Sequence, residues 1–240
     1  MMENISDDER FLAIEENLKE INHNIAEAAV KSGRNPQDIT FMAVTKTVDA
    51  KYIQHALDCG VNLIGENKVQ ELLEKEPLLK GDFKKHIIGH LQTNKVKKIL
   101  THVDMIQSVD SVHLAQEISK CSVNAGIESE ILLEINIGGE ESKTGFPVDG
   151  FTDSLLQIAT LPGVKIMGLM TVPPICEGAE LESYFDAVYK MFIDIKEKNI
   201  DNINMDILSM GMSADYETAI LHGSNLVRVG SRVFGARNYR

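Results

Sequence analysis

The sequence is poor in cysteine, in basic residues and in long apolar runs, and each scarcity excludes a class of protein. Its 240 residues include three cysteines, Cys59, Cys121 and Cys176, which lie far apart in the chain. An odd number at such spacing fits neither a disulfide framework nor a zinc-binding pattern, and it suits a reducing cytosol. We therefore expect a cytoplasmic protein without a bound metal.

Basic residues are outnumbered, with 24 Lys plus Arg against 36 Asp plus Glu and a net charge of −12. Nucleic-acid binding through diffuse charge needs a basic surface, so that class of partner is excluded, whereas a local pocket for one small anion is not. No run approaches the roughly 20 apolar residues of a membrane span. The charged N-terminus also lacks the apolar core of a signal peptide. An acidic surface without an evident apolar stripe favours a monomer.

The apolar residues near the N-terminus are three and four positions apart, which predicts a helix over residues 7–33. The apolar stripe runs from Phe11 to Ala28 and Gly33 follows it. We expect this helix to pack on the body of the same domain. A partner-binding coiled coil is the alternative, but the stripe lasts only about three heptads.

After this helix, strand and helix patterns alternate. Apolar runs predict strands at 39–44, 61–64, 86–88, 103–107, 130–137, 164–169, 205–208 and 226–229. Helical patterns separate them, at 50–58, 67–76, 93–100, 111–124, 150–159, 181–195 and 214–221. Such alternation implies parallel strands joined by crossovers. About eight units in this length predict one domain over 1–240, an α/β (β/α)8 TIM-type barrel, with an open doubly wound sheet as the alternative.

The carboxyl ends of barrel strands are where chemistry is expected, and Lys46 follows the first strand directly. An amine at the mouth of an apolar barrel is desolvated, which lowers its pKa and favours Schiff-base formation with an aldehyde. Position alone also allows an ordinary surface lysine.

Two later clusters suggest an anion site. Small residues after the seventh strand, with a helix expected from Ala214, would direct backbone N–H groups and the Ser213 hydroxyl at an anion, although Ser213 could instead only cap that helix. Arg228 stands between apolar neighbours in the last strand and must meet a carboxylate, a carbonyl or a ligand. Gly230 and Ser231 follow it, and barrels commonly bind phosphate after strands seven and eight.

Two other patterns give weaker evidence for a functional site. His86 and His90 are four apart, which is a metal-ligand spacing on a helix, but here they bracket a strand and a glycine turn. The loop GGEESKTG lacks the ending of a nucleotide-binding P-loop. Neither pattern supports a site.

Six short stretches, taken together, resemble one family. They are AVTKT at 43–47, GENKVQE at 65–71, HIIGHLQTNK at 86–95, GLMTVPP at 168–174, LSMGMSADYETAI at 208–220 and VRVGSRVFGAR at 227–237. They resemble the pyridoxal 5′-phosphate homeostasis protein family (YggS/PROSC type), which is related to the N-terminal barrel domain of alanine racemase. The resemblance runs in order over residues 11–240 and implies a fold-type III barrel that binds pyridoxal 5′-phosphate (PLP).

The resemblance implies a role for each matched position. Lys46 would hold PLP as a Schiff base, Asn67 would lie near the ring, and Arg228 would face the pyridine nitrogen. The phosphate would be held by the segment after the seventh strand and by the one after the eighth, at Met212, Ser213, Gly230 and Ser231. Lys95 and Lys143 match lysines of the family's rim motifs, where a structural and a regulatory role are both open.

The arginine opposite the pyridine nitrogen bears on function. A carboxylate there would keep the nitrogen protonated and the ring an electron sink, whereas an arginine cannot accept that proton. The ring should therefore stabilise carbanions poorly, which suits either holding the cofactor or restricted racemase-like chemistry. The expected function is a PLP carrier in vitamin B6 homeostasis that buffers the aldehyde or supplies it to apo-enzymes, without an assigned catalytic residue. A PLP-dependent amino-acid racemase of restricted scope is the alternative, although the chain leaves no room for the racemase's second domain. An aldolase-type barrel shares only the lysine and the phosphate site.

Overall fold

The computed structural model describes residues 6–235 and begins with the long helix α1 (Asp7–Lys31). Ser6 caps this helix: its hydroxyl accepts from the N–H of Glu9 at 3.3 Å, and the Glu9 carboxylate accepts from the N–H of Ser6 at 2.8 Å. This reciprocal pair satisfies backbone donors that a helix start otherwise leaves unpaired. The predicted N-terminal helix is confirmed, with its end at Lys31 instead of residue 33.

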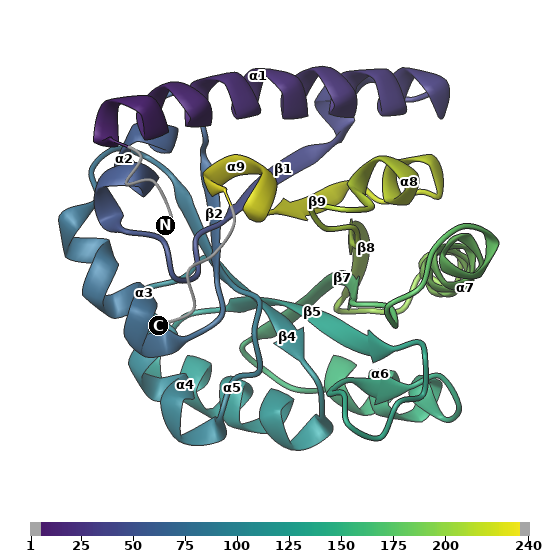
Figure 1. Ribbon diagram of the computed structural model, residues 1–240. Helices are drawn as coiled ribbons and strands as arrows, with labels where there is room; N and C mark the ends of the chain where they lie inside the picture. Colours follow the sequence, from purple (N-terminus) through teal and green to yellow (C-terminus); the bar gives the residue numbers. More distant parts are fainter. Residues whose placement is uncertain (1–5, 236–240) are drawn as a thin grey trace.

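A closed parallel barrel forms the centre of the molecule (Figure 1). Its eight strands are β1 (Thr40–Val44), β2 (Leu63–Glu66), β3 (Lys84–Ile87), β4 (Met105–Val109), β5 (Ser129–Asn136), β7 (Val164–Thr171), β8 (Ile203–Ser209) and β9 (Leu226–Val229). They are hydrogen-bonded in the order β4-β3-β2-β1-β9-β8-β7-β5, and a β4–β5 pairing closes the ring. The barrel is thus confirmed and the open sheet is wrong.

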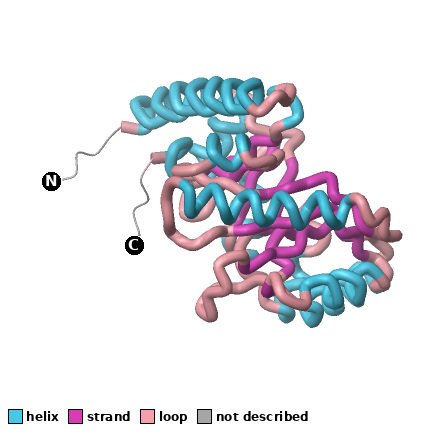
Figure 2. The backbone as a smooth tube through the Cα atoms, turned by 90° about the vertical axis from the view of Figure 1, so that its right-hand side faces the viewer, coloured by secondary structure: helices cyan, strands magenta, loops and turns pink. Residues whose placement is uncertain are grey.

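Helices surround the barrel on the outside, and Figure 2 shows the strands enclosed by them. They are α2 (Ala50–Asp58), α3 (Val69–Lys75), α4 (Thr93–Ile99), α5 (Val112–Ala125), α6 (Phe151–Ala159), α7 (Ala179–Lys196) and α8 (Tyr216–Leu221), with 3-10 turns at Pro36–Asp38 and Glu76–Leu78. None of the helices between residues 6 and 235 combines the length and the apolar character that crossing a lipid bilayer needs.

The long helix α1 lies outside the barrel, over the end of the chain that contains α8 and β9 (Figure 1). Its buried residues Ile14, Leu18, Ile21 and Ile25 belong to one apolar cluster with Val227 and other residues of the strands. The apolar stripe is therefore covered by its own domain, as expected, which leaves no seam for a coiled-coil partner.

Strand alternation separates an inner from an outer layer of side chains. Met42, Leu63 and Leu226 pack together inside the barrel, whereas Ala43 and Val227 pack in the outer layer beneath α1. The same alternation decides which residues at the strand ends face the mouth of the barrel.

Several boundaries shift by one or two residues, and two short elements were not expected. The pair β6 (Phe146–Pro147) and the turn α9 (Ser231–Phe234) were not expected, because two and four residues are too short to show a period. Strand β3 begins at Lys84 because Lys84 and Lys85 pair with Leu63 and Ile64 of β2, which two charged side chains in a row did not suggest. Helix α8 begins at Tyr216 instead of Ala214.

Candidate functional site

The seven residues expected to bind a cofactor lie in or just after four strands that are neighbours in the barrel. The order β2-β1-β9-β8 places the segment of Asn67 beside that of Lys46, then the segment of Arg228, then that of Ser213. Gly230 and Ser231 follow Arg228 on β9, and Met212 precedes Ser213 after β8. All four strand ends point the same way because the strands are parallel. The barrel thereby brings together, on one arc of its mouth, residues that are up to 185 positions apart in the sequence.

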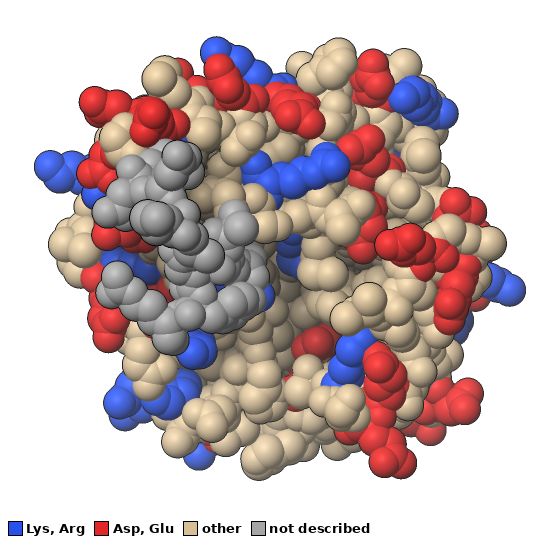
Figure 3. All heavy atoms as spheres, in the orientation of Figure 1, with Lys and Arg blue, Asp and Glu red and all other residues tan. Residues whose placement is uncertain are grey.

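Lys46 lies two residues beyond the end of β1 and is half-buried. Met42 of the same strand points into the barrel, and Lys46 follows it at the carboxyl end of the strand, where the barrel opens. Figure 3 views the molecule in the orientation of Figure 1, with a hollow at the centre in which blue and red atoms are visible. An amine at the mouth of a barrel has the placement that reaction with an aldehyde requires.

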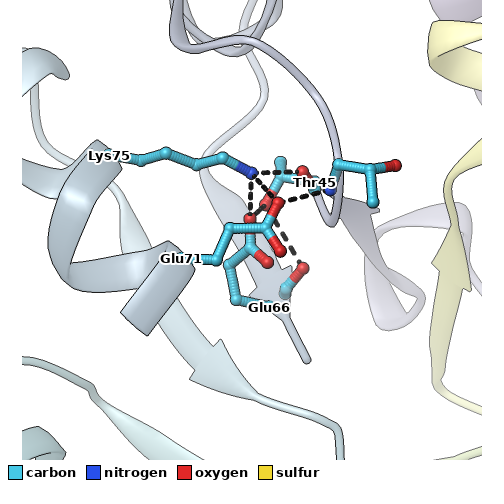
Figure 4. A network of polar contacts seen from close by, with 6 residues as sticks. Thr45, Glu66, Glu71 and Lys75 are labelled. Atoms are coloured by element: carbon cyan, nitrogen blue, oxygen red, sulfur yellow. Dashed lines mark hydrogen bonds and ion pairs between the residues drawn. The ribbon is translucent and has the colours of Figure 1, made fainter. Parts of the chain in front are cut away.

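A network of charged side chains holds the backbone on both sides of Lys46 (Figure 4). The ammonium of Lys75 donates to the carbonyl of Thr45 at 2.7 Å, to Glu66 at 2.7 Å and to Glu71 at 2.6 Å. The hydroxyl of Thr45 donates to Glu66 at 2.7 Å, and Glu71 accepts from the N–H of Thr47. We call Glu66, Glu71 and Lys75 the clamp, because they fix the residue before and the residue after Lys46.

The backbone that the clamp holds is in an unusual conformation. Thr47 has a φ of 63°, in the left-handed region that a β-branched residue rarely adopts. Such strain persists only where surrounding contacts impose it, and it is concentrated at functional sites. Glu66 is buried with its Oε2 atom unpaired among the described residues, and burial raises its pKa although Lys75 opposes that effect. The clamp therefore holds the turn at residues 45–47 although a strained φ at Thr47 and an unpaired buried oxygen of Glu66 both oppose folding.

Arg228 is buried inside the barrel and satisfied by neutral groups. Its guanidinium donates to the hydroxyl of Ser209 at 2.6 Å and to the carbonyl of Thr171 at 2.8 Å. Burial lowers its pKa to about 10, an effect that the negative charges of Glu134 and Asp215 oppose. At neutral pH the guanidinium therefore stays charged and can only donate hydrogen bonds. The expectation that this arginine meets a carbonyl, a carboxylate or a ligand is confirmed by the carbonyl of Thr171.

A chain of hydrogen bonds runs from Arg228 across the barrel to His86. Ser209 donates to Oε1 of Gln107 at 2.7 Å, and Nε2 of Gln107 lies 2.9 Å from Nδ1 of His86. Arginine can only donate hydrogen bonds, so Ser209 accepts from Arg228 and must donate to Gln107. The amide nitrogen of Gln107 then donates in turn, and Nδ1 of His86 is the final acceptor. Burial lowers the pKa of His86 to about 4, so the imidazole is neutral at pH 7. This relay fixes the orientation of Arg228 from the far side of the barrel.

The segments after β8 and β9 meet at the edge of the same mouth. The N–H of Gly230 donates to the hydroxyl of Ser213 at 3.1 Å, and the N–H of Arg228 donates to the carbonyl of Gly211 at 3.0 Å. Ser213 does not cap α8, whose N-cap position is Asp215 without a side-chain cap, so that alternative is wrong. Ser213 is half-buried, whereas Met212 and Ser231 are exposed. The hydroxyls of Ser213 and Ser231 are the donors at this edge that suit a phosphate group.

Asn67 is half-buried where β2 ends, and the next strand exit lies against it. A Cβ added at Gly89 would lie 2.6 Å from the Asn67 carbonyl oxygen and 2.9 Å from its Cβ, so only glycine fits there. Asn67 precedes α3 instead of starting that helix, as the sequence had suggested.

Sequence reasoning missed the clamp and the relay. Glu66 and Glu71 lie inside the GENKVQE motif, but nothing in the local pattern distinguishes them from solvated helix-surface charges. Gln107 and Ser209 sit in apolar strands, where an isolated polar residue is the one available signal. His86 and His90 have different partners, Gln107 and Asp110, and do not form a metal pair.

The two rim lysines lie apart from the clamp. Lys143 donates to the carbonyl of Pro173 at 3.2 Å and pairs with Glu140 at 2.5 Å, which ties the loop after β5 to the loop after β7. Lys95 is half-buried on α4. The contacts of Lys143 accord with its structural interpretation.

Comparison with known proteins gives a consistent result. Residues 17–238 match the family described as alanine racemase, N-terminal domain. A pyridoxal phosphate homeostasis protein of Aquifex aeolicus is 38% identical over 226 residues, which cover 93% of this chain and 98% of the relative. The pyridoxal phosphate homeostasis protein of Escherichia coli K12 is 34% identical over 230 residues, which cover 94% of this chain and 97% of that relative.

Solved structures agree. A crystal structure of an unknown protein from Bifidobacterium adolescentis has a TM-score of 0.90 and 35% identity, covering 96% of this chain and 98% of that one. PipY of Synechococcus elongatus, solved with PLP bound, has a TM-score of 0.78 and 31% identity, and the match covers 88% of this chain and 100% of PipY. An alanine racemase from Streptomyces coelicolor is similar in fold alone, with a TM-score of 0.73 and 15% identity over 59% of its length.

Proposed function

The chain belongs to the family of pyridoxal phosphate homeostasis proteins, and from that membership we infer that it binds PLP and serves its homeostasis. PipY, a relative in this fold, is known with PLP bound. The observation that carries the inference is the gathering of a lysine at the end of β1, a buried arginine on β9 and two phosphate-type segments after β8 and β9, all on three adjacent strands. These donors fit the aldehyde, ring and phosphate of PLP.

We propose that Lys46 holds the cofactor covalently. Its ε-amine would hold the aldehyde of PLP as a Schiff base, with one water released. The clamp would keep the amine at a fixed place by restraining Thr45 and Thr47. Bound PLP supplies a reactive aldehyde and an electron-accepting ring.

The remaining residues are proposed to hold the other end of the cofactor. Ser213, the backbone at Met212, Gly230 and Ser231 would donate hydrogen bonds to the phosphate. The N–H of Gly230 would exchange the Ser213 hydroxyl, and the N–H of Met212 the Asp215 carboxylate, for phosphate oxygens. Arg228 would face the pyridine nitrogen and Asn67 would lie near the ring. An arginine that can only donate would leave this nitrogen unprotonated and the ring a weak electron sink, which suits storage of the cofactor or a racemase of restricted scope.

Borohydride reduction followed by peptide mass analysis tests the covalent site. We expect a phosphopyridoxyl adduct on Lys46 and, in Lys46→Ala, loss of the adduct with residual non-covalent binding through the phosphate segments. Lys143→Ala is the matched control, because it removes a rim lysine and should leave the adduct in place. An unchanged adduct in Lys46→Ala would refute the assignment, and complete loss of binding would mean that the phosphate contacts are weak.

A second experiment separates the carrier from the restricted racemase. The loaded protein is incubated with single amino acids in deuterated water, and α-proton exchange is followed together with optical purity. A carrier gives no sustained exchange. Steady exchange with racemisation would instead establish the enzyme.

Location, partners and assembly follow from the same proposal. The cysteines Cys59, Cys121 and Cys176 are free thiols, which suits the reducing cytoplasm. Delivery of PLP to apo-enzymes would be tested by measuring its transfer to an apo-enzyme in two arrangements. In one the two proteins are mixed, and in the other a dialysis membrane separates them. We propose a monomer, which sedimentation at several concentrations would check.

A further inference from the structure

A second cluster of ligand-type side chains lies away from the barrel mouth, between the outer helices α1 and α2. Glu15 projects from α1, and His55 and Cys59 come from the end of α2. Nε2 of His55 lies 3.1 Å from Oε1 of Glu15 and 3.8 Å from Sγ of Cys59, and all three ligand atoms are within 4.8 Å of one another. We propose that these residues bind one divalent transition-metal ion of the zinc class.

The spacing matches that of a tetrahedral centre. With Zn–S bonds of about 2.3 Å and Zn–N or Zn–O bonds of about 2.0–2.1 Å, tetrahedral angles separate S from N by about 3.6 Å and N from O by about 3.4 Å. The observed separations from His55 are 3.8 Å and 3.1 Å. Both neighbours therefore approach the same imidazole nitrogen at the distances that a shared ion would require, and rotamer adjustments of Glu15 and Cys59 close the third side.

The surrounding structure holds the imidazole in this position. His55 and Cys59 are four residues apart at the end of α2, which puts them on one helix face. The ring of Phe11 packs against that of His55, with centroids 4.6 Å apart. Glu15 is one helical turn beyond Phe11 on α1. The histidine is therefore packed from one side and meets both other ligands on another.

The donor set selects the class of ion. One thiolate, one imidazole and one carboxylate suit zinc and its borderline-soft neighbours, whereas Ca²⁺ and Mg²⁺ require several oxygen ligands. The cluster is partly open to solvent, so the fourth position is available to water. A simple ion pair between Glu15 and His55 accounts for two of the residues but gives no role to Cys59, which makes the cysteine the diagnostic residue.

Titration of the full-length, untagged protein with Co²⁺ and Zn²⁺ tests the site. We expect one Co²⁺ per chain with strong ligand-field absorption in the red, where PLP does not absorb, and displacement by Zn²⁺. Cys59→Ser should abolish that spectrum and weaken Zn²⁺ binding by about tenfold or more, the scale on which loss of even an outer-shell partner weakens metal sites. Cys121→Ser is the matched control, because that thiol is not in the cluster, and it should bind like the unmodified protein.

Stability provides a readout that does not depend on the spectrum. An ion joining α1 to α2 binds only the folded chain, so Zn²⁺ should raise the melting temperature of the unmodified protein and of Cys121→Ser but not of Cys59→Ser or Glu15→Gln. Equal Co²⁺ spectra and equal Zn²⁺ affinity in Cys59→Ser would overturn the proposal. PLP binding is measured in parallel, and its failure would not affect this outcome because the cluster shares no residue with the barrel mouth.

Discussion

Among single residues, Lys75 shows how a side chain outside the cofactor set can govern it. Its ammonium is mostly buried and contacts two carboxylates and the carbonyl before Lys46. Removing one partner of a buried ion pair leaves uncompensated charge, at a cost of about 3–5 kcal/mol. Here that uncompensated charge would lie beside the turn that holds the cofactor lysine.

We predict that Lys75→Met lowers PLP affinity by about tenfold or more, equivalent to about 1.4 kcal/mol, and reduces the fraction trapped by borohydride. Thr47 would lose the restraint on its left-handed conformation once Glu71 is released from the ammonium. The matched control is Lys85→Met, which breaks the ion pair between Lys85 on β3 and Glu76 in the turn after α3, a pair that makes no hydrogen bond to residues 45–47. Equal affinity in the two variants would count against the clamp. Glu71→Gln supplies a milder test if Lys75→Met fails to fold.

His86 predicts a pH dependence of stability. Its pKa is about 4 in the folded state against an ordinary 6.5, so the unfolded chain binds the extra proton between these values. The contribution of this group is fully present above about pH 6.5 and declines as the pH falls toward 4, by about 3 kcal/mol in total. Urea denaturation at pH 4.5 and pH 7 should show a smaller difference for His86→Gln, which keeps an acceptor for Gln107. An identical pH difference in both proteins would contradict the assignment.

At the scale of elements, the turn between β8 and α8 depends on a close approach. Gly211 has a φ of 94°, and a Cβ there would lie 2.5 Å from Cβ of Ala219 and 3.0 Å from Cα of Tyr216. Its carbonyl also accepts from the N–H of Arg228. The helix that follows the turn is therefore packed directly against the segment proposed to bind phosphate.

We predict that Gly211→Ala weakens PLP binding, because α8 must shift and carry Ser213 with it. Gly60→Ala is the matched control: its φ of 99° is nearly the same, but nothing lies within 4 Å of the added Cβ. That variant should lose only about 1 kcal/mol of stability from backbone strain and bind PLP normally. The two affinities are compared by equilibrium dialysis, and equal values would exclude a role for the close approach.

For the whole molecule, the closed barrel and α1 form one packed body in the described residues. Side chains of α1 reach the end of the chain, where Asn17 donates to the carbonyl of Val233 at 3.0 Å and Asn24 donates to the hydroxyl of Tyr216 at 3.2 Å. Arg34 donates to the carbonyl of Ser224 at 2.8 Å. The first and last elements are thus fastened to each other.

We predict that the chain unfolds as one cooperative domain. Urea transitions followed by far-ultraviolet circular dichroism and by the visible absorption of bound PLP should coincide at saturating cofactor. An N-terminal helix that melted separately would give an earlier far-ultraviolet transition with the PLP signal unchanged. Ile21→Ala, which removes a buried side chain of α1, should shift both transitions together by about 2–5 kcal/mol.

The sequence by itself determined the elements and the chemistry carried at their ends. Apolar periods of two and of three to four residues depend only on neighbours along the chain, so they located eight strands, the helix α1 and the positions of Lys46, Arg228 and Ser213. The short elements β6 and α9 were beyond that reach, because they contain less than one readable period.

Only the tertiary structure decided which strand exits are neighbours and which charges meet. Closure of the barrel brings Glu66 and Lys75 to the Lys46 turn, links Arg228 to His86 through Ser209 and Gln107, and places α1 over α2 so that Glu15 reaches His55. These contacts join positions from 9 to 102 residues apart. The physical reason for these contacts is the order of the strands and the packing of the helices, which together bury a charge beside particular partners. No local pattern of side chains encodes that order or that packing.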